Sequence, residues 1–319
     1  MTPGTRPLVS ARQCRSRLSS GLRLIRKPSS QDGRPSSAPC GHSPTVRLVE
    51  LVSLGYRTDL ALLKAGGSEI EDRGDHYVVR SPHNPTHWWG NFLLLAETPP
   101  PEGAAVWLDR FAAAFPNAAH VALGFDTTSA GPGEIVWFSD RGFKAESMSV
   151  MTATDLVEPT HKGEAECRQL GSEEDWKQSV ELGMACSGPH FEERSHRLYL
   201  EAKMRTQRQL VEGGLGAWFG AFVNGRLASQ MGLFSAGDGL ARFQSVETHP
   251  ELRRRGLARS LLLHAGHYGL DEMGARTLVI VADPEYFAID LYRTVGFVVT
   301  EVQLQVERSP ASSLGPRLE

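Results

Sequence analysis

Phe243-Gln-Ser-Val-Glu-Thr-His-Pro250 is followed directly by Glu251-Leu-Arg-Arg-Arg-Gly-Leu-Ala258, and the chain changes character at the proline. The first part has the composition of a β-strand, and the second passes through three arginines and a glycine. Apolar residues then recur with the spacing of one helix face, at Ala258, Leu261, Leu262 and Ala265. A glycine-containing turn at a helix N-terminus offers unpaired backbone N–H groups and the positive end of the helix dipole, and both favour a bound phosphate. The sequence therefore predicts a strand, an anion-binding turn and a helix.

A second group of elements is predicted further along the chain. Leu278-Val-Ile-Val281 is a short, apolar, β-branched run that is typical of a buried strand. A short helix is predicted to open at Asp283-Pro-Glu285 and to run through Leu291. The block Leu291-Tyr-Arg-Thr-Val-Gly-Phe297 follows, and another strand is predicted over residues 298–306.

Together the two blocks resemble the GNAT family of acetyltransferases. Arg253-x-x-Gly256-x-Ala258 is similar to the family signature Arg/Gln-x-x-Gly-x-Gly/Ala, whose loop holds the pyrophosphate of acetyl-coenzyme A. Leu291-Tyr-x-x-x-Gly-Phe297 is similar to a second family block. Tyr292 lies 39 residues after Arg253, close to the separation of the two blocks in the family. The resemblance covers about residues 165–307.

The resemblance implies a fold, a reaction and a co-substrate. The fold class is α/β (α+β), with two GNAT-type lobes that each contain a mixed, mostly antiparallel sheet flanked by helices. The reaction is an acyl transfer in which acetyl-coenzyme A gives its acetyl group directly to a primary amine of a small molecule or peptide. No metal is expected to take part. The alternative function is a non-catalytic acyl-coenzyme A binding or sensing module.

The resemblance also implies a set of site residues. Tyr292 would protonate the departing thiolate, although a tyrosine that merely packs in a helix is the alternative. Glu247 is a candidate general base, but strand alternation leaves its direction open, and His249, Glu301 or a base acting through water are further options. The residues expected to contact the coenzyme lie on the strand and the turn: Val246, Thr248, Arg253, Arg254, Arg255, Gly256, Leu257 and Ala258.

Two further segments bear on how the coenzyme and the acceptor would bind. Many family members have an asparagine before the tyrosine helix, and this chain has Asp283-Pro-Glu-Tyr286, so the resemblance does not extend to the coenzyme contact made by that asparagine. Acceptor recognition is expected from helices predicted over residues 173–182 and 192–211 and from a hairpin at Asn224-Gly225. The acidity of the chain outside its leader favours a cationic amine.

Residues 48–155 contain a weaker copy of the C-terminal half. Leu94-Leu-Ala-Glu-Thr-Pro-Pro100 aligns with residues 244–250, and Phe138-Ser-Asp-Arg-Gly-Phe143 aligns with residues 292–297. A repeat of this length predicts two copies of one unit, over 48–155 and 165–307, with a linker at 156–164 and a tail at 308–319. The first copy is expected to be degenerate, because its loop after Pro100 lacks arginine and Phe138 has no hydroxyl. The pair Trp88-Trp89 marks either core packing at a strand entry or the wall of an acceptor pocket.

Residues 1–47 form a basic leader. Eight arginines and one lysine stand against one aspartate, which gives +8, so with a whole-chain charge of −3 the remainder carries −11. The leader is rich in serine, proline and glycine and is expected to be disordered. The high ratio of arginine to lysine in the whole chain (28 to 6) indicates a GC-rich coding sequence, in which spurious upstream reading frames run long. This favours the interpretation that the start of the reading frame was misassigned and that the leader is an artefact. A transit peptide or a basic nucleic-acid tail are the alternatives.

The composition restricts the cellular compartment and the binding partners that we expect for this protein. With 40% hydrophobic and 22% charged residues, the sequence contains no apolar run of the length that spans a bilayer. The four cysteines are scattered without metal or redox spacing, which predicts a reducing compartment. The expected location is the cytoplasm, or an organelle matrix if the leader is a transit peptide. The expected partner is an amine acceptor, with no membrane or nucleic-acid binding, and the expected state is a monomer or homodimer.

Overall fold

The computed structural model describes residues 51–129, 135–158, 165–187 and 193–308. The predicted leader, most of the linker and nearly all of the tail lie outside these ranges. The N-terminal half contains the following elements: α1 (Leu54–Ala65), β1 (Glu69–Asp72), β2 (His76–Arg80), η1 (Trp88–Gly90), β3 (Phe92–Leu95), α2 (Ala104–Ala114), β4 (Val121–Phe125), α3 (Val136–Ser139) and β5 (Lys144–Ala153). The C-terminal half contains the remainder: β6 (Glu166–Gln169), α4 (Glu173–Cys186), α5 (Glu193–Glu212), β7 (Gly216–Val223), β8 (Arg226–Gly237), β9 (Leu240–Thr248), η3 (Pro250–Leu252), α6 (Leu257–His267), η4 (Tyr268–Glu272), β10 (Thr277–Ala282), α7 (Ala288–Thr294) and β11 (Val298–Arg308).

The strands form one continuous sheet in the order β1-β2-β3-β4-β11-β5-β10-β9-β8-β7-β6. The pairs β3–β4 and β9–β10 are parallel, and the other neighbours are antiparallel. The mixed, mostly antiparallel sheet flanked by helices confirms the predicted fold class. The sequence predicted a separate sheet in each half, and this detail is wrong because the final strands of the two halves are exchanged.

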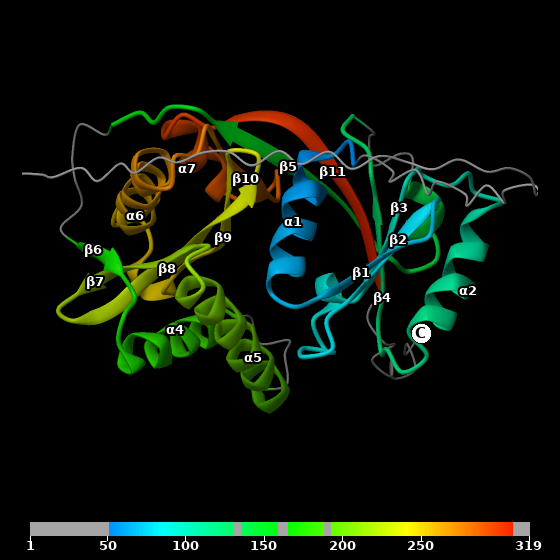
Figure 1. Ribbon diagram of the computed structural model, residues 1–319, viewed down its shortest axis with the longest axis horizontal. Helices are drawn as coiled ribbons and strands as arrows, with labels where there is room; N and C mark the ends of the chain where they lie inside the picture. Colours follow the sequence, from blue (N-terminus) through cyan, green and yellow to red (C-terminus); the bar gives the residue numbers. More distant parts are fainter. Residues whose placement is uncertain (1–50, 130–134, 159–164, 188–192, 309–319) are drawn as a thin grey trace, which may run out of the picture. The chain divides into compact units, whose positions relative to one another are not determined.

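The exchange places β11 between β4 and β5, and β5 between β11 and β10. Figure 1 shows the two long strands side by side, β5 in green and β11 in red. On either side of this pair the order is the same, since β4-β3-β2-β1 mirrors β10-β9-β8-β7. This symmetric order agrees with the interpretation of two related halves. The exact lobe boundaries stay a prediction.

Local chemistry accounts for two of the turns. Asn224 and Gly225 have φ values of 52° and 75°, so the predicted hairpin between β7 and β8 has the two left-handed residues of a type I′ turn. The helix predicted from Asp283 begins later, at Ala288. The carboxylate of Asp283 accepts a hydrogen bond from the Glu285 amide at 2.8 Å, which closes a local turn before the helix can start.

The C-terminal half of the sheet has a core on each face. Side chains of successive strand residues point to opposite faces, so Trp218 packs with α4 and α5 residues while Phe219 packs with residues of α6. Figure 1 shows α4 and α5 on one side of β7–β9 and α6 and α7 on the other. Within the described ranges, no helix combines the length and the apolar character that crossing a membrane requires.

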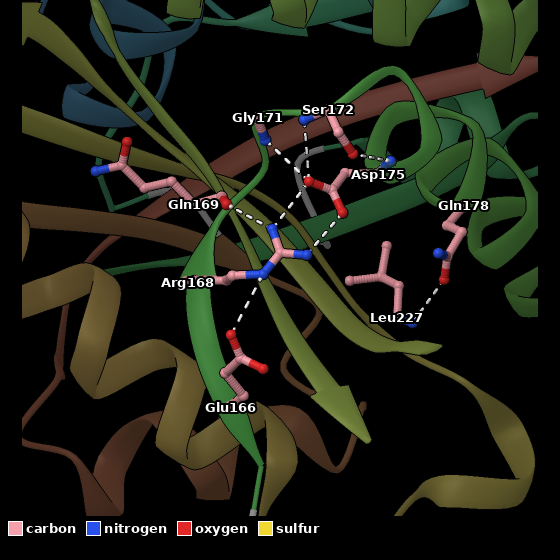
Figure 2. A network of polar contacts seen from close by, with 8 residues as sticks. All are labelled: Glu166, Arg168, Gln169, Gly171, Ser172, Asp175, Gln178 and Leu227. Atoms are coloured by element: carbon pink, nitrogen blue, oxygen red, sulfur yellow. Dashed lines mark hydrogen bonds and ion pairs between the residues drawn. The ribbon is translucent and has the colours of Figure 1, made fainter. Parts of the chain in front are cut away.

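A polar network fixes the start of α4, the helix whose end reaches the candidate site (Figure 2). Ser172 and Asp175 form a capping box, and both oxygens of Asp175 accept hydrogen bonds from Arg168, at 2.8 and 2.9 Å. The guanidinium also lies 3.8 Å over the ring of Phe222. Further along the helix, Gln178 accepts a hydrogen bond from the backbone N–H of Leu227 at 2.8 Å, which ties α4 to β8.

Asp175→Asn is expected to lower the free energy of unfolding by about 2 kcal/mol, because it weakens a charge-assisted hydrogen-bond pair and a helix cap together. The Arg168 hydrogen bonds outweigh burial and lower the pKa of Asp175 well below its usual value. A depressed carboxyl pKa stabilises the fold above the unfolded value and ceases to do so as the pH falls below it, so the difference between wild type and variant should shrink below about pH 4. Urea titrations at several pH values measure this. Asp290→Asn, at an exposed ion pair with Arg293, is the control and should cost less than about 0.5 kcal/mol.

Candidate active site

Two neighbouring parallel strands separate where the site begins. The pairing of β9 with β10 stops at Arg242 and Val279, although β9 continues to Thr248. A bulge interrupts the pairing of β9 with β8 just beyond this point, between Gln244 and Glu247, and Ser245 takes a φ of 51°. The end of β9 therefore leaves β10 while it stays paired with β8, and its backbone borders a cavity on the β10 side.

The turn after β9 has the geometry expected of an anion-binding turn. Gly256 is the N-cap of α6 with a φ of 75°, a conformation that favours glycine, and no side chain caps the helix. No heavy atom lies within 4 Å of the place that a Cβ would occupy at Gly256. Arg254 also has a positive φ, of 60°. The side chain of Arg253 donates from Nε to the carbonyl oxygen of Thr248 at 3.2 Å, so it braces the turn against the strand.

This turn, β9, α4 and the segment before α7 enclose a cavity of about 370 Å³, which we call the donor cavity. Seven of the eight residues predicted to contact the coenzyme line it; Arg255 is exposed and is not among the lining residues. Sequence reasoning missed lining residues from α4 and from the loop after β10. The donor cavity is lined by Gly183, Cys186, Ser187, Val246, Glu247, Thr248, Leu252, Arg253, Arg254, Gly256, Leu257, Ala258, Arg259, Tyr286, Phe287, Ala288 and Leu291.

Tyr292 does not line the donor cavity, although its neighbour Leu291 does. The ring is 5% exposed and packs edge-on against Phe297, with 6.4 Å between the ring centroids. Burial raises the pKa of the Tyr292 hydroxyl well above its usual value, so the phenol keeps its proton at neutral pH. Its role as proton donor stays a prediction.

A second cavity, of about 510 Å³, adjoins the first, and we call it the acceptor cavity. Its walls come from the segment around η1 and from α5, and Ser187 and Glu247 line both cavities. The position of Trp88 and Trp89 in this lining agrees with the pocket interpretation of the tryptophan pair. Helix α5 contributes as expected, whereas the Asn224-Gly225 turn does not line this cavity. The lining residues are Thr86, His87, Trp88, Trp89, Ser187, Ser195, His196, Tyr199, Leu200, Lys203, Glu247 and Glu307.

A buried chain of hydrogen bonds holds Glu247 where the cavities meet. The carboxylate accepts from Nε2 of Gln230 at 2.7 Å, and the same Nε2 donates to the carbonyl oxygen of Ser179 at 3.0 Å. Gln230 is 1% exposed, and its Oε1 accepts from the indole of Trp218 at 3.1 Å. Because each partner is buried and bonded, the carboxylate is oriented before any substrate binds.

The other candidate bases lie elsewhere. Glu301 accepts a hydrogen bond from the backbone N–H of Leu54 at 2.7 Å and lines neither the donor nor the acceptor cavity. His249 lines a third cavity beside Arg226 and Glu181. Of the three side chains considered from sequence, Glu247 is the one that borders both cavities.

A serine–histidine contact lies on the same boundary. The hydroxyl of Ser187 donates to the carbonyl oxygen of Gly183 at 2.8 Å, and His196 Nε2 lies 2.5 Å from the same hydroxyl. Since a hydroxyl has one proton, His196 Nε2 carries the hydrogen of this second bond. Burial and the nearby Lys203 lower the pKa of His196, so its ring is neutral at neutral pH.

Comparisons with known proteins agree with this geometry. Residues 180–297 match the model of the acetyltransferase (GNAT) family. A GCN5-related N-acetyltransferase from Kribbella flavida is similar in structure, with a TM-score of 0.56, 15% identity and coverage of 82% of this chain and 98% of that chain. A second from Sphaerobacter thermophilus has a TM-score of 0.51, 15% identity and coverage of 75% and 82%. A functionally unknown conserved protein from Staphylococcus epidermidis has a TM-score of 0.57, 12% identity and coverage of 75% and 92%.

These findings define the class of protein. Residues 180–297 are a domain of the GNAT acetyltransferase family, whose members use acetyl-coenzyme A. The structural similarity, at identities of 12–15%, shows that the fold of both halves together is a fold found in GNAT proteins. A search of curated protein sequences found no match. The match of residues 180–297 to an acetyltransferase family supports acyl transfer in general.

Proposed function

We propose that this protein is an acetyl-coenzyme A-dependent N-acetyltransferase that moves the acetyl group directly to a primary amine. The observation that carries the proposal is the shared position of Glu247, which borders the donor and acceptor cavities at once. A carboxylate there can take a proton from an amine in one cavity while the amine attacks a thioester in the other. Direct transfer needs such a junction, because both substrates must meet in one complex.

The donor cavity has the chemistry that the coenzyme requires. The start of α6 has no side-chain cap, so its first N–H groups and the helix dipole are available for a pyrophosphate. Arg254 lines the cavity beside this turn and adds positive charge. The apolar side chains of Val246 and Leu252 suit the narrow pantetheine arm. Asp283, which stands where many relatives have asparagine, does not line the cavity, so a coenzyme contact by this residue is not part of the proposal.

The proposed reaction uses three groups of the chain. Glu247 accepts a proton from the amine as its nitrogen attacks the thioester carbon. The N–H of Val246, on the separated end of β9, is suited to hold the developing oxyanion. The C–N bond forms, the C–S bond breaks, and the hydroxyl of Tyr292 gives its proton to the thiolate. The amide and coenzyme A then leave, and the cycle closes when Glu247 gives its proton to solvent and the Tyr292 phenolate takes one up.

Two measurements test the proposal. Calorimetry should show about one acetyl-coenzyme A site per chain, because the loop after Pro100 lacks the arginines of the C-terminal half, and its glycine, Gly103, has a φ of −90° where Gly256 has a φ of 75°. A panel of amines, polyamines, amino acids and peptides is then screened for release of coenzyme A. Tight coenzyme binding without turnover of any acceptor would contradict the enzyme and support an acyl-coenzyme A sensor.

Gly256→Val should raise the Kd for acetyl-coenzyme A by about 100-fold or more, because a β-branched side chain would fill the approach to the turn and disfavour its positive φ. Calorimetry measures the change. Gly142→Val is the matched control, since Gly142 has a φ of 76° and equally open surroundings but does not line the donor cavity. An equal loss of affinity in both variants would show that backbone strain, and not the site, is responsible.

A further inference from the structure

The acceptor cavity adjoins a further cavity of about 280 Å³, which we call the inner cavity. The two cavities share four lining residues, His87, Trp89, Tyr199 and Lys203. Lys203 therefore stands at the junction of the two cavities, as Glu247 stands at the junction of the acceptor and donor cavities. The acceptor cavity thus has Glu247 at its boundary with the donor cavity and Lys203 at its boundary with the inner cavity.

One face of α5 forms this path. His196, Tyr199, Lys203 and Gln207 follow one another at intervals of three and four residues, which is the spacing of neighbours on one side of a helix. His196 lines the acceptor cavity, Gln207 lines the inner cavity, and the two residues between them line both. The ring of Tyr199 contacts the rings of His196 and His87, with centroids 5.7 and 5.6 Å apart.

Lys203 is the cation of this path that forms no ion pair with a carboxylate of the described residues. Arg242 also lines the inner cavity, but it is already bound to Asp59 at 2.9 Å, to the hydroxyl of Thr58 at 3.0 Å and to the carbonyl oxygen of Phe243 at 3.2 Å. Among the described residues, no carboxylate lies within 4 Å of the Lys203 ammonium group, and no hydrogen bond to it is found.

The other charged groups of the acceptor cavity do not take this role. Glu247 is held by Gln230, and Glu307 accepts the indole N–H of Trp89 at 2.9 Å. Burial lowers the pKa of His87 to about 3, so this ring is neutral at neutral pH. Burial opposes the charge of Lys203, but Tyr199 and Glu247 outweigh it and raise its pKa, so the ammonium group stays protonated.

A half-buried ammonium group gains binding free energy when an anion reaches ion-pair distance, and no carboxylate of the described residues does so at Lys203. We infer that the acceptor bears a carboxylate as well as its amine, and that Lys203 binds this carboxylate while the amine faces Glu247. The class of acceptor is an amino acid or a similar zwitterion, with its side chain against the aromatic wall of Trp88, Trp89 and Tyr199. Glu247 and Glu307 oppose a doubly charged phosphate, which favours the singly charged carboxylate. The inference rests on the proposed function and modifies the expectation of a purely cationic amine.

Matched pairs of acceptors test the inference. Phenylalanine with phenethylamine, tryptophan with tryptamine, and leucine with isoamylamine differ by the carboxylate alone. The wild-type protein should favour the amino acid of at least one pair by about 10- to 100-fold in kcat/KM, the usual effect of a hydrogen bond to a charged group. Lys203→Met should remove this preference, because it should lower kcat/KM for the amino acids far more than kcat/KM for the amines. Lys203→Arg keeps the charge and should retain part of the preference.

Binding measurements keep the inference separate from the proposed function. Calorimetry with the same pairs is carried out on wild-type protein saturated with coenzyme A, so that no turnover is needed. The amino acids should bind to wild type and lose affinity in Lys203→Met, while the Kd for acetyl-coenzyme A stays the same. If amino acids bind in this way but no acceptor is acetylated, the proposed reaction fails and the inference stands. The inference is overturned if no amino acid binds, if the amines bind equally well, or if Lys203→Met leaves the preference intact.

Discussion

Tyr292→Phe is expected to lower kcat by about 10² to 10⁴, the usual contribution of a positioned proton donor, and to leave the Kd for acetyl-coenzyme A unchanged. The substitution keeps the ring that packs against Phe297 and removes the hydroxyl alone. The raised pKa of this hydroxyl means that the donor is fully protonated across the neutral range. Steady-state rates with an identified acceptor, together with thermal unfolding, measure the effect.

The control for this variant is another tyrosine of the same core. Tyr268 packs edge-on against Phe219 and does not line the donor cavity, so Tyr268→Phe should change kcat less than about twofold. Unchanged turnover in Tyr292→Phe would show that the thiolate takes its proton from water or from the acceptor. Tyr292 would then be a packing residue, as its position away from the cavity lining allows.

The anion-binding turn around Gly256 could be predicted from the sequence because the residues that determine it are close together in the chain. Gly256, the preceding arginines and the apolar spacing of the next helix all lie within about one strand and one helix of each other. The structure has a positive φ at Gly256 and no side-chain cap on α6, as an anion-binding turn requires. The β10 strand and the hairpin at Asn224-Gly225 were predictable for the same reason.

The exchange of β5 and β11 between the two halves could not be predicted from local sequence. Both strands were visible as strand patterns, but a pattern shows that a strand pairs and not which strand it pairs with. In β11, Leu304 pairs with Ser147 on one side and with Phe125 on the other, and both partners are more than 150 residues away. Partners at such separations leave no mark in the local sequence.

The acceptor path shows a second limit of sequence reasoning. The spacing of His196, Tyr199 and Lys203 on α5 is visible in the sequence, and the helix was expected to recognise the acceptor. What the spacing does not reveal is that this face meets His87 and Trp89, which come from the other half of the chain. Nor does it reveal which of the basic residues already has a carboxylate partner.

The direction of Glu247 depends on the bulge in β9. Simple alternation along a strand left this side chain free to face either side of the sheet. In the structure, Gln230 pairs with Glu247 and Gly232 pairs with Gln244, so two residues of β9 stand opposite one residue of β8. Such a bulge shifts the alternation for every later residue of the strand. Glu247 thereby reaches the boundary of the two cavities.

Glu247→Gln is expected to lower kcat by about 10² to 10⁴, because it removes the base and preserves the shape of the side chain. The amide oxygen of glutamine can still accept the hydrogen bond from Gln230, so the buried chain from Trp218 stays intact. The Kd for acetyl-coenzyme A should stay the same, since glutamine keeps the size and shape of the side chain that lines the donor cavity. Rates are measured as a function of pH, and the loss should be largest at neutral pH, where an amine most needs a base.

The matched control for this variant is Glu307→Gln, a change of the same kind in a carboxylate that lines the acceptor cavity but not the donor cavity. This variant should change KM and retain the pH dependence of wild type, because Glu307 does not border the donor cavity, in which the thioester is proposed to lie. If Glu247→Gln turns over like wild type, the proton leaves through water or through His196, whose neutral ring borders the same cavity. A loss confined to the double variant Glu247→Gln with His196→Gln would then assign the base to the pair, because each group could replace the other.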